Sequence, residues 1–342
     1  MQSIETIAES GSSLFVSIVT PFYNEGEGVE LFYEAITRIF NDLSEVRFEV
    51  VCVDDGSKDD TLPRLQGLAT KDARFKVLEL TRNFGKEAAL TAGIDAASGD
   101  AVIPMDADLQ DPPELIGKMI SEWKAGSDVV IARRADRSVD SFLKRKSAEW
   151  FYRLHNKMSA ISIPENVGDF RLMNRATVDA LRQLPEQQRF MKGLFAWVGF
   201  RTKVIEYTRE ERAAGESKFS GWKLWNLALE GITSFSTAPL RVWTYIGIAI
   251  ATMSLIYTAF IVLRTIISGV NVPGYASLLV AVLFLGSLQL ISIGVLGEYI
   301  GRIYVESKRR PMYLVREVYE SSKTGLSMPN FKSNVIQRAD VG

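Results

Sequence analysis

A pair of carboxylates in this sequence has a spacing that suits metal chemistry. Asp106 and Asp108 stand one residue apart, directly after the apolar run Ala101–Met105. Carboxylates at positions i and i+2 of a turn can both reach a hard divalent cation that keeps several waters and binds diphosphate oxygens. The chain contains one histidine and one cysteine, which excludes Cys/His zinc clusters, disulfide frameworks and multi-histidine metal sites. The pattern therefore predicts Mg²⁺ or Mn²⁺ on oxygen ligands.

The sequence lacks the motifs of several other common kinds of functional site. A Ser-His-Asp or Cys-His triad would have to use His155, which lies in a polar, helix-like stretch without a Gly-x-Ser-x-Gly motif nearby. We interpret His155 as a partly exposed helix residue. The dinucleotide fingerprint and the P-loop motif are both absent. A balance of 40 Lys and Arg against 41 Asp and Glu argues against a general nucleic-acid binder, so we expect no nucleic acid among the partners.

The elements that would position these carboxylates follow from the hydrophobic pattern of residues 14–132. Apolar, β-branched runs alternate there with amphipathic segments of helix length. We expect strands at 15–20, 48–53, 75–80, 101–105 and 128–132, and helices near 28–43, 59–70, 86–97 and 113–124. This order, with short connections, predicts an α/β fold with a mostly parallel, Rossmann-like sheet flanked by helices.

Polar loops follow three of the expected strands. They are residues 21–25, 54–61 and 106–113, after the first, second and fourth strand. Ligands bind outside the carboxyl ends of the strands in such sheets, so we expect the three loops to converge on one crevice.

The C-terminal third differs in composition from the rest. Residues 242–263 and 265–297 carry no charged side chain, and the first run would span roughly 33 Å as a helix, against about 30 Å for a hydrocarbon core. We expect two membrane-spanning helices, near 242–267 and 275–300; the alternative is a buried helical hairpin. Lys and Arg gather outside the pair, so the positive-inside rule places both large ends in the cytoplasm.

The segments around this helical pair have their own patterns. Tryptophans and few charges in residues 221–241 predict an interfacial amphipathic helix, with a helix packed on the α/β domain as the alternative. Residues 303–320 form a second basic, amphipathic segment. Small residues on the second span permit close helix approach and suggest a homo-oligomer; they are Gly286, Ser287, Ser292, Gly294 and Gly297.

Five loops together resemble those of a known family. They are residues 21–25, 53–61, 82–86, 106–113 and 168–172. In order and spacing they are similar to the loops of polyprenyl- and dolichyl-phosphate glycosyltransferases of the GT-A fold, family 2. Over about residues 14–320, the chain looks most like the bacterial bactoprenol glucosyltransferases of the GtrB type, which carry two C-terminal membrane helices.

The resemblance implies a domain plan and an activity. The plan is a tail at 1–13, a GT-A catalytic domain at 14–220, the interfacial segment at 221–241, two transmembrane helices within 242–300 and a cytoplasmic segment at 301–342. The activity is inverting transfer of a hexose, with glucose from UDP-glucose as the first choice, to undecaprenyl phosphate. The enzyme would be an integral protein of the inner (plasma) membrane.

Roles also carry over from the family residue by residue. Nucleotide-sugar contacts would come from Pro21, Tyr23, Glu25, Asp54, Asp55, Lys86 and Arg133. The metal would be held by Asp108, Asp106 and Gln110, and the catalytic group would include Asp106, Asp108, Asp169 and Arg171. The acceptor phosphate would be held by Arg134, Ser217 and Lys218. Phe219 stands where the family usually has Tyr, so a hydroxyl is missing there.

The acceptor's chemistry fits the shortage of histidine. A phosphate monoester has a second pKa near 6, so at pH 7 it is mostly dianionic and needs no strong general base. The alternatives within the class are mannose from GDP-mannose and amino-arabinose from its UDP derivative. A processive polysaccharide synthase is a further alternative, but it needs a Gln-x-x-Arg-Trp motif, of which residues 187–190 are a distant echo. A membrane-anchored sugar-nucleotide sensor would have no use for the acceptor arginines.

Overall fold

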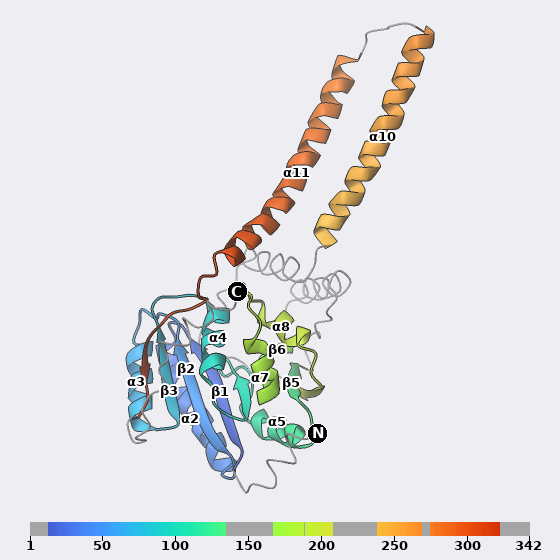
Figure 1. Ribbon diagram of the computed structural model, residues 1–342. Coiled ribbons are helices and arrows are strands. Elements are labelled where there is room, and N and C mark those ends of the chain that lie inside the picture. The colour runs from blue at the N-terminus through green and yellow to red at the C-terminus, as the bar shows by residue number, and fades with distance from the viewer. Residues whose placement is uncertain (1–12, 135–166, 188, 208–237, 269–273, 322–342) are drawn as a thin grey trace.

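The computed structural model describes residues 13–134, 167–187, 189–207, 238–268 and 274–321. In this part of the chain, an α/β domain carries two long helices that project together from one of its ends (Figure 1). The segments on which His155, Ser217, Lys218 and Phe219 fall lie outside the described residues, as does most of the expected interfacial segment.

One sheet of eight strands organises the described α/β domain, in the order β7-β5-β6-β4-β1-β2-β3-β8. Their bounds are β1 (Phe15–Phe22), β2 (Arg47–Asp54), β3 (Phe75–Leu80), β4 (Ala101–Pro104), β5 (Val129–Arg134), β6 (Val167–Asn174), β7 (Thr202–Tyr207) and β8 (Val315–Tyr319). All neighbouring pairs are parallel except those that involve β6 and β8. The mostly parallel sheet is confirmed, and the first five strands end within two residues of the predicted positions.

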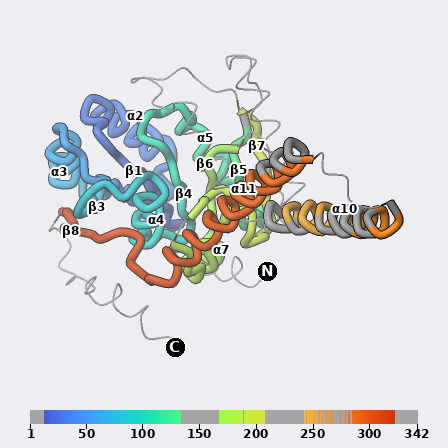
Figure 2. The backbone as a smooth tube through the Cα atoms, turned by 90° about the horizontal axis from the view of Figure 1, so that it is seen from above, coloured from blue at the N-terminus to red at the C-terminus, as the bar shows by residue number. Residues whose placement is uncertain are grey.

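Helices cover both faces of this sheet (Figure 2). One face carries α2 (Val29–Asp42), α3 (Thr61–Lys71) and α5 (Leu115–Lys124), and the other carries α4 (Lys86–Ala96), α7 (Arg175–Arg182) and α8 (Met191–Trp197). Successive residues of a strand point to opposite faces, so Val50 of β2 packs in the first core and Val51 in the second. A short 3₁₀ helix, η1 (Gly26–Gly28), precedes α2.

The strand β8 was not predicted from the sequence. Within residues 303–320, which the sequence indicated only as a basic, amphipathic segment, the chain ends a helix and then pairs antiparallel with β3. Buried Glu79 of β3 accepts hydrogen bonds from Arg316 Nη1 and Tyr319 Oη, each at 2.8 Å. The chain that follows the projecting helices therefore returns to the sheet and covers its β3 edge.

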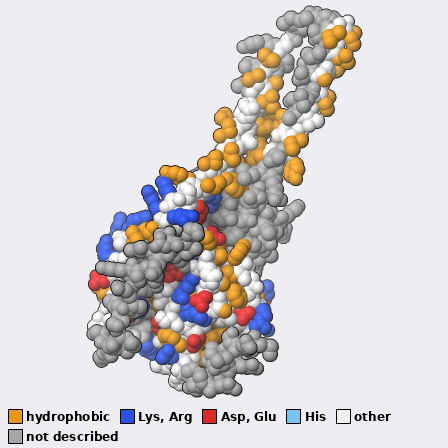
Figure 3. All heavy atoms as spheres, viewed as in Figure 1, with side chains coloured by type: hydrophobic (Ala, Val, Ile, Leu, Met, Phe, Trp, Pro, Cys, Tyr) orange, Lys and Arg blue, Asp and Glu red, His pale blue; other side chains and the backbone are white. Residues whose placement is uncertain are grey.

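The two projecting helices are α10 (Ala238–Ser268) and α11 (Tyr275–Ser307). Hydrophobic side chains line both of them (Figure 3), and Phe260 and Leu290 are 57% and 72% exposed. By length and hydropathy, one described segment, Phe284–Ser307 of α11, qualifies as a membrane span. The helical pair is thus present, but crossing of a membrane by both helices is not confirmed.

Gly93 decides how closely α4 lies on the sheet. A Cβ atom at this position would stand 2.3 Å from Val19 Cγ1 and 3.1 Å from Val53 Cγ2. Both neighbours are β-branched residues of buried strands, so neither can turn away cheaply. The tight contact holds the first residues of α4 at the carboxyl ends of β1 and β2.

We expect Gly93→Ala to lower the free energy of unfolding by about 1–3 kcal/mol, because overpacking outweighs the gain in helix propensity. The matched control is Gly67→Ala on α3, where a Cβ would meet nothing within 4 Å. That variant should be neutral or stabilised by about 0.5–1 kcal/mol. Thermal unfolding in detergent measures both, and equal stability of the two variants would contradict this packing.

Candidate active site

The loops at the carboxyl ends of β1 and β2 are locked together by hydrogen bonds. Asn24 N donates to Ser57 Oγ at 3.0 Å, and Lys58 N donates back to Asn24 Oδ1 at 2.8 Å. Glu25 N donates to Thr61 Oγ1 at 2.9 Å. Asn24 has a φ of 52°, a left-handed conformation that asparagine tolerates better than most residues. These contacts give the loop with Pro21, Tyr23 and Glu25 a fixed shape beside the second loop.

Asp55 joins the second loop to the third. Its two carboxylate oxygens accept hydrogen bonds from Phe84 N at 2.7 Å and Gly85 N at 2.9 Å. Gly56 has a φ of +68°, and a Cβ there would lie 2.6 Å from the backbone of residues 82 and 83, so the position needs glycine. Asp55 therefore uses both oxygens to shape the crevice.

Asp54, in the same loop, keeps one carboxylate oxygen without a hydrogen-bond partner among the described residues. It is buried, and its Oδ2 accepts a hydrogen bond from Ser57 N at 3.2 Å. Its Oδ1 is buried and has no hydrogen-bond partner among the described residues. Burial raises the pKa of this carboxyl, and the nearby Glu79 raises it further. A buried acceptor without a partner marks a place where a ligand donor fits.

Lys86, at the first position of α4, bridges two carboxylates from different strands. Its Nζ lies 2.7 Å from Asp106 Oδ1, after β4, and 2.8 Å from Asp169 Oδ2 on β6. Burial would raise the pKa of Asp169, but the charges of Lys86 and Lys192 lower it well below its usual range. Burial raises the pKa of Asp106, against the opposing effect of Lys86. Asp169 Oδ1 is buried and has no partner among the described residues.

The predicted metal-binding loop turns back on itself after β4. Gln110 N donates to Asp108 Oδ1 at 3.2 Å, and Leu109 between them has a φ of 52°. The Oε1 atom of buried Gln110 has no hydrogen-bond partner in the described part of the chain. No three His, Cys, Asp or Glu side chains form a metal-binding group among the described residues. Two carboxylates and an orphaned amide oxygen nevertheless form a donor set that suits a hard cation with several waters.

Two contacts in this region were missed by the sequence analysis. Tyr207, the last residue of β7, donates a hydrogen bond from its hydroxyl to buried Asp111. This hydrogen bond holds the C-terminal part of the loop at residues 106–113. Arg133, which we expect at the nucleotide sugar, forms an ion pair with Glu206 on the neighbouring strand. The side chain of Arg134 lies outside the described residues.

Arg171 is buried beside Asp169, because both belong to β6 and are two residues apart. Its Nη2 donates to Gly168 O at 2.8 Å, its Nε donates to Asp169 O at 3.3 Å, and its Cζ lies 4.0 Å from the centre of the Phe195 ring. Burial lowers the pKa of Arg171 to about 10, so the guanidinium remains charged at neutral pH.

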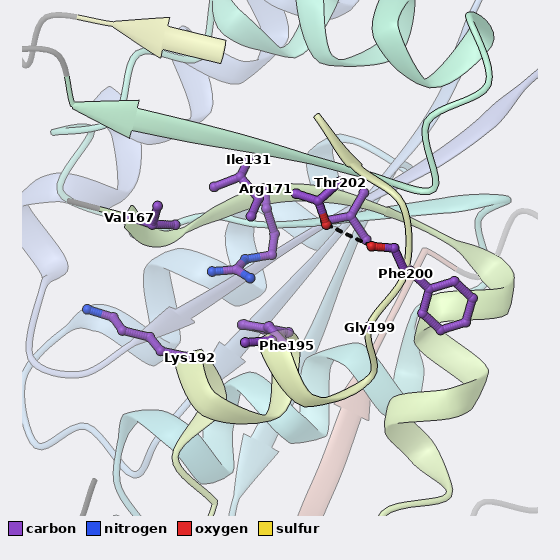
Figure 4. Close-up of a pocket in the computed structure, with 10 residues that line it drawn as sticks. Ile131, Val167, Arg171, Lys192, Phe195, Gly199, Phe200 and Thr202 are labelled. Atoms are coloured by element: carbon purple, nitrogen blue, oxygen red, sulfur yellow. Dashed lines mark hydrogen bonds between the residues drawn. The ribbon is translucent and has the colours of Figure 1, made fainter. Parts of the chain in front are cut away.

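A pocket opens next to this guanidinium, between α8 and the strands β5, β6 and β7 (Figure 4). Arg171 and Lys192 are its charged lining residues. Lys192, the second residue of α8, was not singled out from the sequence, because a lone lysine in a short helix carries no pattern. The described structure thus brings together Lys86, Asp106 and Asp169, with Arg171 and Lys192 beside them.

Comparisons with known proteins identify the family of this chain. Residues 17–182 match the model of the glycosyl transferase family 2, and residues 238–303 match that of the GtrB C-terminal hairpin. The chain is 58% identical to a bactoprenol glucosyl transferase of Shigella phage SfV, over 88% of this chain and 98% of that protein. It is 56% identical to a prophage bactoprenol glucosyl transferase homolog of Escherichia coli (strain K12), over 89% and 99%. An uncharacterized glycosyltransferase of Synechocystis is 52% identical, over 89% and 95%. The chain therefore belongs to glycosyltransferase family 2 and, within it, to the group of the bactoprenol glucosyl transferases.

Proposed function

We propose that this protein transfers a glucosyl group from UDP-glucose to a polyprenyl phosphate, with inversion, at the cytoplasmic face of a membrane. The observation that carries the proposal is the identity of 56–58% to bactoprenol glucosyl transferases over nearly their whole length. The crevice supports it, because an orphaned buried carboxylate oxygen, an acidic loop and a lysine-bridged aspartate lie around the carboxyl ends of neighbouring strands.

The donor nucleotide would lie along the loops after β1 and β2. Asp54 Oδ1 would accept a hydrogen bond from the base or ribose, and the half-exposed ring of Tyr23 would lie against the base. Asp55 would act through the loop that it shapes, since both its oxygens are already engaged. Pro21 and Glu25 would complete this wall of the site.

The diphosphate would lie at the acidic loop. Asp106, Asp108 and Gln110 would hold Mg²⁺ or Mn²⁺ there, and the cation would neutralise charge on the leaving diphosphate. Lys86 would keep Asp106 and Asp169 at a fixed separation, so that the sugar between them meets a preorganised surface.

The transfer needs no proton movement. An oxygen of the dianionic acceptor phosphate attacks C1 of the glucosyl group, and the bond from C1 to the diphosphate oxygen breaks with its electron pair leaving on UDP. Total charge is conserved in this exchange. Asp169, with its lowered pKa, is a poor base, so we assign it to orienting the sugar or the acceptor rather than to deprotonation.

The acceptor's lipid tail requires a site at the membrane. We propose that both α10 and α11 span it, which is supported by the match of residues 238–303 to a family hairpin and by the exposed apolar side chains on both helices. Glu306 near the end of α11 accepts a hydrogen bond from Gln187 N at 2.8 Å. This contact lies at the point where the helices meet the α/β domain.

We expect Asp108→Asn to lower kcat/KM for glucosyl transfer by about a hundredfold or more, because the cation would lose a charged ligand. Membranes are incubated with labelled UDP-glucose and undecaprenyl phosphate, and label in the organic phase is counted. The matched control is Asp42→Asn, an exposed residue at the end of α2, away from the carboxyl ends of the strands. Chelation of divalent cations should abolish transfer in every variant; transfer that survives chelation would refute the metal assignment.

The donor is tested in the same assay with three labelled sugars. UDP-glucose should label the lipid, whereas GDP-mannose and the UDP derivative of amino-arabinose should not, since relatives that are 56–58% identical are named for glucosyl transfer. Label that enters the organic phase only from GDP-mannose would overturn the choice of sugar and leave the reaction class intact.

A further inference from the structure

The proposed glucosyl transfer assigns no role to the pocket beside Arg171. It has a volume of about 140 Å³ and lies between α8 and the strands β5, β6 and β7. Apolar side chains form most of its wall, among them Val129, Ile131, Val167 and Phe195. Its charged lining residues are both cations, so the pocket suits a ligand that is anionic at one end and apolar at the other.

The two cations lie at the same end of the pocket. Figure 4 shows the Arg171 guanidinium and the Lys192 side chain on one side, and Gly199 and Phe200 on the other. The charge of Lys192 also lowers the pKa of Asp169, so the cationic end is the end that adjoins the lysine-bridged aspartate. A ligand anion held there would be next to the proposed position of the sugar.

Neither cation is neutralised by a close carboxylate contact. The hydrogen bonds of Arg171 go to two main-chain carbonyls, those of Gly168 and Asp169, and its face stacks on Phe195. Half-buried Lys192 forms no ion pair within 4 Å with the described residues, although its charge acts on the carboxylates of Asp169 and Glu87. Burying a charge costs free energy unless a partner compensates it, so the buried Arg171 guanidinium, with Lys192 beside it, favours the arrival of an anion.

Size and position limit what that anion can be. A water molecule occupies about 30 Å³ and a drug-sized ligand needs roughly 300 Å³ or more, so a nucleotide sugar is too large for this pocket. A phosphate group with the first carbons of a chain fits its volume. The segment just before α8 contacts α11 through Gln187 and Glu306, so the pocket lies near the helices that reach the membrane.

We propose that this pocket seats the acceptor: Lys192 and Arg171 bind the phosphate monoester, and the first isoprenoid carbons lie against Val129, Ile131 and Phe195. The inference rests on the proposed function and adds Lys192 as an acceptor-binding residue. The phosphate oxygen next to Asp169 is then the one that attacks the sugar.

The test separates the acceptor phosphate from the donor diphosphate as the source of the anion. Lys192→Gln should raise the KM for farnesyl phosphate or undecaprenyl phosphate about ten- to a hundredfold, the loss expected for one charge-assisted hydrogen bond. The KM for UDP-glucose should stay within about twofold of the wild-type value. Lys192→Arg should recover most of the loss, and the control Lys118→Gln, on exposed α5 surface, should change neither constant.

A second variant probes the apolar wall and guards against misfolding. Ala196→Leu narrows the pocket without touching either charge and should also raise the acceptor KM alone. Unchanged thermal unfolding of each variant shows that the fold is retained. Wild-type protein that transfers glucose to no prenyl phosphate would refute the proposed function itself. Active wild-type protein whose Lys192→Gln variant keeps its acceptor KM, or loses affinity for UDP-glucose instead, would refute only this pocket assignment.

Discussion

The bridge that Lys86 makes between Asp106 and Asp169 is the contact on which the geometry of the site depends. It joins a loop after β4 to a strand that runs the opposite way, and so fixes the two walls of the crevice at one separation. Without the ammonium, two carboxylates would face each other at short range, where like charges repel. The close packing of α4 on the sheet at Gly93 supports this bridge, because it fixes the position of Lys86, the first residue of α4, relative to the strands.

The antiparallel strand β6 gives the site its asymmetry. Its alternation places Phe170 and Leu172 in one core and turns Asp169 and Arg171 to the other face, toward α4 and α8. An acidic group and a basic group therefore stand side by side on one strand. Acidic loops at one end and cations at the other divide the site into a part suited to a metal-bound diphosphate and a part suited to a second anion.

The sequence predicted the parallel half of the sheet well, since each of its strands is an apolar, β-branched run followed by a turn and an amphipathic helix. It predicted β6 only as a loop motif, because Asp169 and Arg171 interrupt the apolar pattern that identifies a buried strand. The bridge itself could not be predicted, as its partners lie 20 and 83 residues from Lys86 in the chain. Lys192 was missed for a related reason: only the folded chain shows that its helix closes a pocket.

The two edge strands of the sheet, β7 and β8, lie on either side of the helical hairpin in the chain. The hairpin is therefore joined covalently to opposite borders of the α/β domain, and on the β8 side only residues 308–314 intervene. If both helices span a membrane, as we propose, this short connection would tie the height and tilt of the α/β domain to α11, and the crevice would keep a nearly constant orientation toward a lipid headgroup.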